Sequence, residues 1–247
     1  MFNKLMSGLG LQGIQIDTRL HNTQLQAGQT LSGEVNCKGT SSNKNINGIH
    51  LQLQTSAEVE SGDSEFNTSL IIAQWHISGA FELQANQSHR FPFSVQLPFE
   101  TPLTEVPCRQ NKSRVWLHTH LDVDWGLDAT DKDFMQILPT TTQQMFIQAM
   151  QQCGYNLTTV DTEKGQVPWN GVQATVGCYQ ELEFKPQGCF RGVNEIEVSF
   201  VAEAHQTHVL MEVDRTFRGD GFKSMTIPHN QATVANIVHE IKRLLGI

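Results

Sequence analysis

Apolar and polar residues alternate with a period of two through most of the first half of this 247-residue chain. In residues 49–59, Ile49, Leu51 and Leu53 are separated by polar side chains. The same alternation recurs at residues 14–20, 31–37, 75–83, 91–97 and 115–125. Successive side chains of a strand point to opposite faces of a sheet, so this alternation predicts half-buried β-strands. Turn-forming residues separate these segments without intervening helices, which favours an antiparallel β-sandwich.

The pattern changes near residue 126. Residues 126–133 are predicted to form an acidic loop, and apolar residues then repeat at helical spacing over residues 145–153. Gly154 is expected to end that helix. Alternation resumes at residues 182–184, 196–202 and 209–213. A second amphipathic helix is predicted at about residues 231–245, and we expect it to pack on a sheet because isolated helices of this length are marginal in water.

The predicted fold is therefore all-β, with two antiparallel β-sandwich domains in tandem and a few short peripheral helices. We assign the N-terminal domain to residues 1–130, a linker to 131–142, and the C-terminal domain with its terminal helix to 143–247. The predicted core of the first domain is Leu51, Leu53, Trp75, Phe81, Phe93, Val95, Leu97, Leu117 and Leu121. That of the second is Phe184, Ile196, Val198, Phe200, Met211 and Val213.

Charge and cysteine usage exclude several classes of protein. The formal net charge is −8, from 17 basic and 25 acidic residues, whereas a nucleic-acid-binding protein needs a basic surface. No apolar run approaches the roughly 20 residues of a membrane span, so no integral membrane association is expected. The five cysteines are scattered without a C-x-x-C pair, which is typical of a reducing compartment and predicts a cytoplasmic protein.

Two segments resemble the arrestin-type sandwich. Residues 25–35 (LQAGQTLSGEV) resemble the early arrestin hairpin, with Leu25 and Ala27 where Tyr and Pro are usual. Residues 91–98 (FPFSVQLP), followed by Pro102, resemble the arrestin strand that ends in Leu-Pro. These segments indicate an arrestin-like fold for the tandem domains.

Further segments resemble, in the same order, the SpoOM (sporulation-control protein M) family, and the resemblance covers nearly the whole chain. They are residues 114–117, 121–122, 127–133, 190–192, 210–215 and 218–219. The resemblance implies a cytosolic bacterial regulatory or scaffold protein linked to sporulation control, without catalysis or cofactors. Such a protein would act by binding other proteins, and it could also form a homo-oligomer.

The resemblance to arrestins also implies a charged contact between the two domains. Three acidic residues lie in the predicted linker region, namely Asp128, Asp131 and Asp133. Three basic residues lie near predicted strand ends of the second domain, namely Arg191, Arg215 and Arg218. Our hypothesis is that at least one of these aspartates pairs with one of these arginines across the junction, against the alternative that all six are solvated loop charges.

One group of residues offers an alternative function. His118, His120, Asp122 and Asp124 alternate along one predicted strand, so they share a face at the ~6.5–7 Å spacing of residues i and i+2. Imidazole and carboxylate groups can together bind zinc. The alternative function is therefore a metal-binding protein or a cation-dependent enzyme that uses the His/Asp cluster of residues 118–133. We assign no metal site, because a solvent-facing row of polar residues explains the same pattern.

No catalytic or cofactor-binding residue is assigned. The glycines of residues 8–13 match G-x-G-x-x-G, but a dinucleotide site needs a preceding strand and a following helix, which the pattern does not provide. The sequence contains no G-x-S-x-G, Walker or H-E-x-x-H motif. We therefore predict that the protein is not an enzyme.

Overall fold

The computed structural model describes residues 13–61, 64–169, 171–188, 192–216 and 221–247. The first half contains strands β1 (Gln15–Leu20), β2 (Gln24–Gln26), β3 (Thr30–Lys38), β4 (Lys44–Ser61), β5 (Ser64–Ser78), β6 (Phe81–Leu83), β7 (Ser88–Gln96), β8 (Gln110–Asn111), β9 (Val115–Val123) and β10 (Ala129–Leu138). The second half contains helix α1 (Thr141–Gln152), strands β11 (Tyr155–Lys164), β12 (Cys178–Pro186), β13 (Glu195–Ala202), β14 (Gln206–Asp214) and β15 (Gly221–Pro228), and helix α2 (Val234–Leu245). The predominance of strands confirms the all-β part of the predicted fold class.

The first domain is a sandwich of two sheets. One sheet has the order β1–β3–β7, and the other is built on β4, which pairs with β5 and β6 and with β9, followed by β10 and β2. Their apolar faces enclose one core cluster. Leu51, Leu53, Phe93, Leu97, Leu117 and Leu121 are buried there as predicted, while Trp75, Phe81 and Val95 are half-buried at its margin.

The second domain is a single antiparallel sheet in the order β15–β14–β13–β12–β11. One face packs against α1 and α2 around a second core, which contains the predicted residues Phe184, Ile196, Val198, Met211 and Val213. Phe200 is half-buried and packs edge-to-face on Phe146 of α1. On the opposite face, Val167 and Ala174 of the β11–β12 connection pack on Val201 and Leu210.

Both predicted helices are present. Thr140 and Gln143 form a reciprocal capping box at the start of α1, and Gly154 follows its end with a φ of 85°. Helix α2 begins at Val234, later than predicted, because residues 229–231 form a 3-10 turn before the cap Thr233. Its apolar stripe enters the second core beside α1, so the prediction that the helix packs is confirmed.

The segment predicted as a linker, residues 131–142, is mostly strand. Strand β10 pairs with β9 in antiparallel and with β2 in parallel orientation, and only Pro139 and Thr140 separate it from α1. The charged residues Asp131, Lys132 and Asp133 gave the segment the composition of a loop, whereas the buried side chains that define the strand come later, at its end.

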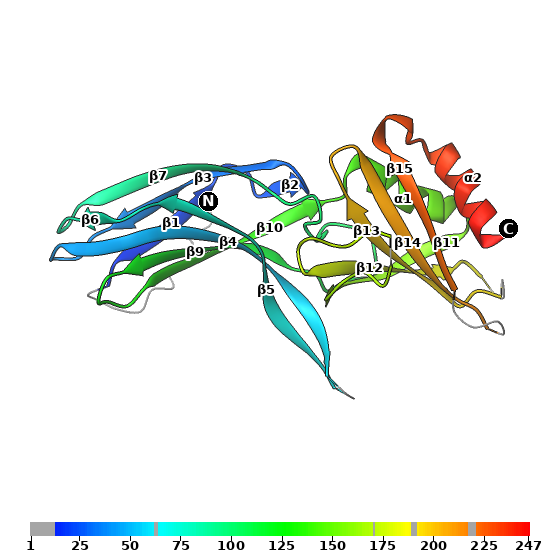
Figure 1. The fold of residues 1–247 in the computed structure, drawn as a ribbon, viewed down its shortest axis with the longest axis horizontal. Coiled ribbons are helices and arrows are strands. Elements are labelled where there is room, and N and C mark those ends of the chain that lie inside the picture. Colours follow the sequence, from blue (N-terminus) through cyan, green and yellow to red (C-terminus); the bar gives the residue numbers. More distant parts are fainter. Residues whose placement is uncertain (1–12, 62–63, 170, 189–191, 217–220) are drawn as a thin grey trace.

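The two domains meet side by side, and the long β4–β5 hairpin projects away from the body near their junction (Figure 1). Strand β11 of the second domain pairs with β4 at Glu163 and Glu58, which links the two sheets edge to edge. Within the residues described above, no helix has the length and apolarity needed to cross a membrane.

Candidate functional site

The structure places the predicted metal candidates on the outer face of β9 and in the turn after it, but their side chains bind different partners. His120 contacts Asp128, with 2.9 Å between Nε2 and Oδ2. Asp122 accepts a hydrogen bond of 3.0 Å from the amide of Asn47. His118 lies in register with Lys132 of β10. Burial lowers the pKa of His118, and the charges of His120 and Lys132 lower it further. No three of the four candidate residues, all of which the structure describes, bring their ligand atoms within 4.8 Å of one another.

Among the described residues, one group of three ligands has all its ligand atoms within 4.8 Å of one another, and it lies elsewhere. It consists of Glu58, Asp161 and Glu163 at the junction of the domains. The ammonium group of Lys112 lies 3.3 Å from both Glu58 Oε1 and Asp161 Oδ2. The position that a cation would take near these carboxylates is thus shared with a lysine of the chain itself.

Two aspartates of the predicted interdomain contact, Asp128 and Asp131, make hydrogen bonds within the first domain. Asp128 accepts hydrogen bonds from the backbone amide of Val123 and from His120. The hydrogen bond from Val123 is the main cause that lowers the pKa of Asp128, and burial opposes it. Asp131 accepts from the backbone amide of Thr18 at 2.8 Å. Asp133 lies half-buried in β10 and is not free of partners.

The arginines of that hypothesis are partly outside the described residues. Arg191 and Arg218 lie in segments that the structure does not describe. Arg215 donates a hydrogen bond of 3.4 Å to the carbonyl of Leu245, the last residue of α2. Arg215 is therefore engaged within its own domain.

Lys112 instead makes a charged contact between the domains. The segment after β7 crosses to the second domain, where β8 pairs with β11, and returns to enter β9. Lys112, at the return point, bridges Glu58 of β4 and Asp161 of β11. Burial lowers the pKa of Lys112, but the charges and hydrogen bonds of both carboxylates outweigh it and raise the pKa. For Asp161, burial raises the pKa, and the charge and hydrogen bond of Lys112 offset this rise only in part.

An uncharged polar network surrounds this bridge. The hydroxyl groups of Ser113 and Thr162 share a buried hydrogen bond of 2.8 Å between the domains. The side-chain amide of Gln180 accepts from the Leu103 amide at 3.0 Å, donates to the Leu103 carbonyl at 2.9 Å, and donates to Ser113 Oγ at 2.8 Å. These bonds fix the crossing segment to the second domain.

The pocket beside this network is small. It is lined by the crossing segment, α1, β12 and β13, and its cavity volume is about 20 Å³. Such a volume holds about one water molecule and not a substrate.

Acidic side chains crowd the face of the second sheet that lies opposite the helices. Burial raises the pKa of Glu181 on β12 to about 8, and the charge of Glu197 on β13 adds to it. Burial and the charge of Glu212 raise the pKa of Glu197 to about 7. Neighbouring strands bring these residues together, since Glu197 pairs in register with both Glu183 and Glu212.

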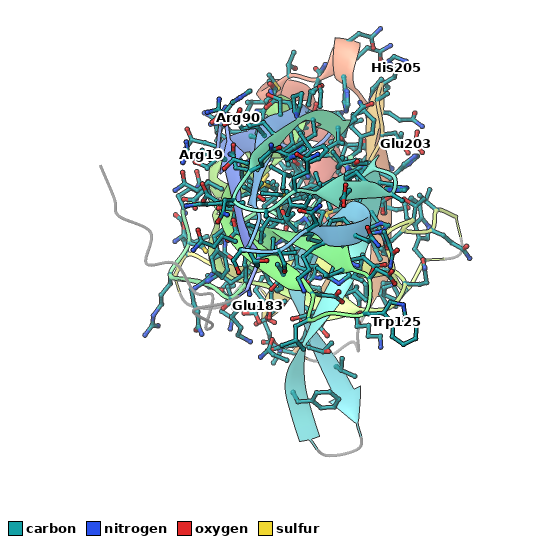
Figure 2. All side chains as sticks on the ribbon, turned by 90° about the vertical axis from the view of Figure 1, so that its left-hand side faces the viewer. Arg19, Arg90, Trp125, Glu183, Glu203 and His205 are labelled. Atoms are coloured by element: carbon teal, nitrogen blue, oxygen red, sulfur yellow. The ribbon has the colours of Figure 1, made fainter. Side chains whose placement is uncertain are left out.

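The turn between β9 and β10 exposes two large apolar side chains. Trp125 is 99% exposed and Leu127 is 94% exposed, although such residues are usually at least partly buried. Trp125 has a φ of 51°, which is uncommon for a bulky residue. Figure 2 shows its ring at the margin of the molecule, turned away from the body. We name Trp125 and Leu127 the apolar tip.

The described cysteines do not form a nucleophilic site. Burial raises the pKa of Cys37 and Cys178 to about 12, so both remain thiols at neutral pH, whereas a reactive cysteine is a thiolate. Cys153 is buried, and burial also raises the pKa of Cys108.

Sequence reasoning did not find the residues of the Lys112 bridge or the apolar tip. Glu58, Lys112 and Asp161 are distant in the chain, and no local pattern marks them as a group. The tip was missed because the alternation of residues 115–125 predicted Trp125 on a strand face, whereas β9 ends at Val123 and Trp125 lies in the turn after it.

Sequence comparisons with known proteins indicate one family, and a solved structure shares the fold. The sequence profile of the SpoOM protein family matches residues 2–217. The sporulation-control protein spo0M of Bacillus subtilis (strain 168) is 30% identical over 220 residues, which are 88% of this chain and 82% of that protein. The crystal structure of Spo0M, the sporulation control protein from Bacillus subtilis, shares the fold at a TM-score of 0.84 and 23% identity, covering 94% of this chain and 98% of that one.

Proposed function

Because this chain belongs to the SpoOM protein family, we propose that it is a non-catalytic regulatory protein that acts in sporulation control by binding other proteins in the bacterial cytoplasm. The name of the Bacillus subtilis relative supports the regulatory part of this proposal. The small junction pocket and the buried thiols support the absence of catalysis.

The apolar tip carries the proposal that the function is protein binding. Large aromatic side chains contribute much of the binding energy at protein interfaces, and the tip exposes Trp125 together with Leu127 at one turn. The tip is flanked in sequence by three acidic residues, Asp122, Asp124 and Asp128, which make its surroundings negatively charged. The partner surface that fits it is an apolar pocket with a basic rim, because complementary charge guides association.

The test is affinity purification from cells of the source organism, with partners quantified by mass spectrometry. Wild type is compared with Trp125→Ala and with Phe222→Ser, a control that changes a 51%-exposed aromatic on β15 of the other domain. We expect Trp125→Ala to reduce the retained partners by at least about tenfold, as for an interface hot spot, and Phe222→Ser to retain them. Equal partner recovery by all three proteins, or recovery no higher than from an empty matrix, contradicts the proposal.

A further inference from the structure

Three histidines form a row across the outer face of the first domain. His50 of β4 is in register with His76 of β5 on one side and with His120 of β9 on the other. The ring centroids of His50 and His76 are 4.7 Å apart, and those of His50 and His120 are 6.2 Å apart. We name these three residues the histidine row.

The two outer rings of the row are held by oxygen acceptors. His120 Nε2 lies 2.9 Å from Oδ2 of Asp128, and His76 Nε2 contacts the backbone carbonyl of Ser78. Because a carboxylate and a carbonyl accept hydrogen bonds, Nε2 of each ring carries a proton. A neutral ring of this kind presents its lone pair at Nδ1. Metal-binding histidines have the same arrangement, with the other ring N–H donated to a carboxylate or backbone carbonyl.

Gly48 of β4 leaves room for the row. A Cβ atom at this position would lie 3.0 Å from His76 Nε2 and 3.3 Å from His50 Nε2, which is tighter than ordinary contact. The absence of a side chain therefore lets the rings of His50 and His76 lie side by side, with planes inclined by only 21°.

We propose that the histidine row binds a divalent transition-metal ion such as Zn²⁺, with His50, His76 and His120 as ligands and Asp128 and the Ser78 carbonyl as supporting groups. Imidazole nitrogen suits Zn²⁺, Cu²⁺ and Ni²⁺, whereas Mg²⁺ and Ca²⁺ take oxygen ligands. Water completes the coordination on the solvent side of the sheet.

Binding requires a local rotation of side chains. The three histidines do not bring their ring nitrogens within 4.8 Å of one another as a group, so His50 must turn about its Cα–Cβ bond to meet the ion. His76 is exposed and His50 and His120 are half-buried, so the surface position permits this change. The stacked rings of His50 and His76 then exchange their ring contact for coordination to the ion.

The test is isothermal titration of untagged, metal-free protein with ZnCl₂ and, separately, with MgCl₂. The variants are His50→Gln, Asp128→Asn, Glu163→Gln at the junction carboxylates, and the matched control His239→Gln, which changes an exposed histidine on α2 of the other domain. Circular dichroism establishes that each variant is folded. Long-range ¹H–¹⁵N spectra of the ring nitrogens show which histidines change on Zn²⁺ addition, without any substitution.

We expect one Zn²⁺ per chain, no Mg²⁺ binding, and shifts at the three histidines of the row. His50→Gln should abolish binding, His239→Gln should leave it unchanged, and Asp128→Asn should weaken it by about 10–100-fold, as for other supporting groups. Absence of Zn²⁺ binding overturns the proposal. So does binding that survives His50→Gln but is lost in Glu163→Gln, because the ion would then occupy the carboxylate group at the junction.

Discussion

Replacing Glu181 by Gln should stabilise the protein at alkaline pH. Glu181 is half-buried on β12, and its ionised form faces the carboxylates of Glu197, Glu163, Asp161 and Glu212. Burial, followed by these charges, raises its pKa to about 8. Gln keeps the shape of the side chain but cannot ionise, so the variant removes the unfavourable charge alone.

The size and sign follow from the pKa of Glu181 in the folded and unfolded states. Its ordinary value is 4.5 and its folded value is about 8, which at about 1.36 kcal/mol per pH unit corresponds to ~5 kcal/mol. Water screens a half-buried group, so we expect ~2 kcal/mol. The folded pKa is the higher one, so the protonated carboxyl of Glu181 is the form that favours folding. The stability that it contributes is fully present below pH 4.5 and is lost as the pH rises through about 8.

The assay is urea denaturation of wild type and Glu181→Gln at pH 5, 7 and 9, with the free energy of unfolding as the readout. The variant should match wild type near pH 5 and exceed it at pH 9. Glu240→Gln on α2 is the matched control, since a hydrogen bond from Arg243 lowers the pKa of Glu240 and this substitution should bring no gain at pH 9. A Glu181→Gln protein that is no more stable than wild type at pH 9 would refute the reasoning.

Three further predictions concern packing and the junction. Phe93→Ala should lower the free energy of unfolding by ~3–5 kcal/mol in denaturant melts, because Phe93 is 7% exposed in the first core. Truncation after His229 removes α2 and should lower the melting temperature, because the helix covers the second core; an unchanged melting temperature would contradict this. A double-mutant cycle of Lys112→Met and Asp161→Asn should give a coupling of ~0.5–3 kcal/mol. Lys185→Met, which breaks a bridge within one domain, should not couple to Asp161→Asn.

The strands that could be predicted are those with one buried face. In β3, Leu31, Val35 and Cys37 are buried at every second position with Gly33 between them, and the sequence shows the same alternation. Strand β10 lacks this signal over its first half, because it carries charged residues on both faces there and buries Met135 and Ile137 only near its end. It is held by pairing with β9 and β2, and such long-range pairing is not visible in the segment itself.

The charged contact between the domains shows a second limit. The resemblance to arrestins led us to the aspartates of the expected linker, but Asp128 and Asp131 accept hydrogen bonds from residues of their own domain. The sequence did not predict a role for Lys112 in this contact, because Lys112 precedes a strand in a segment with no distinctive pattern. Its position between Glu58 and Asp161 depends on the crossing of the β8 segment to β11, which only the topology of the fold determines.

The histidine row shows why functional groups in a sheet are difficult to predict from one strand. Residues i and i+2 of a strand are ~6.5–7 Å apart, whereas directly opposed residues on neighbouring strands are ~4.5–5.5 Å apart. His120 therefore lies closer to His50, which opposes it on β4, than to His118, which lies two residues before it on β9. The register that opposes them is fixed by the core, since Leu51 and Leu53 are fully buried on the other face of β4. A slip of one residue would expose these leucines and bury His50. The apolar residues that determine the fold thus also determine which histidines become neighbours.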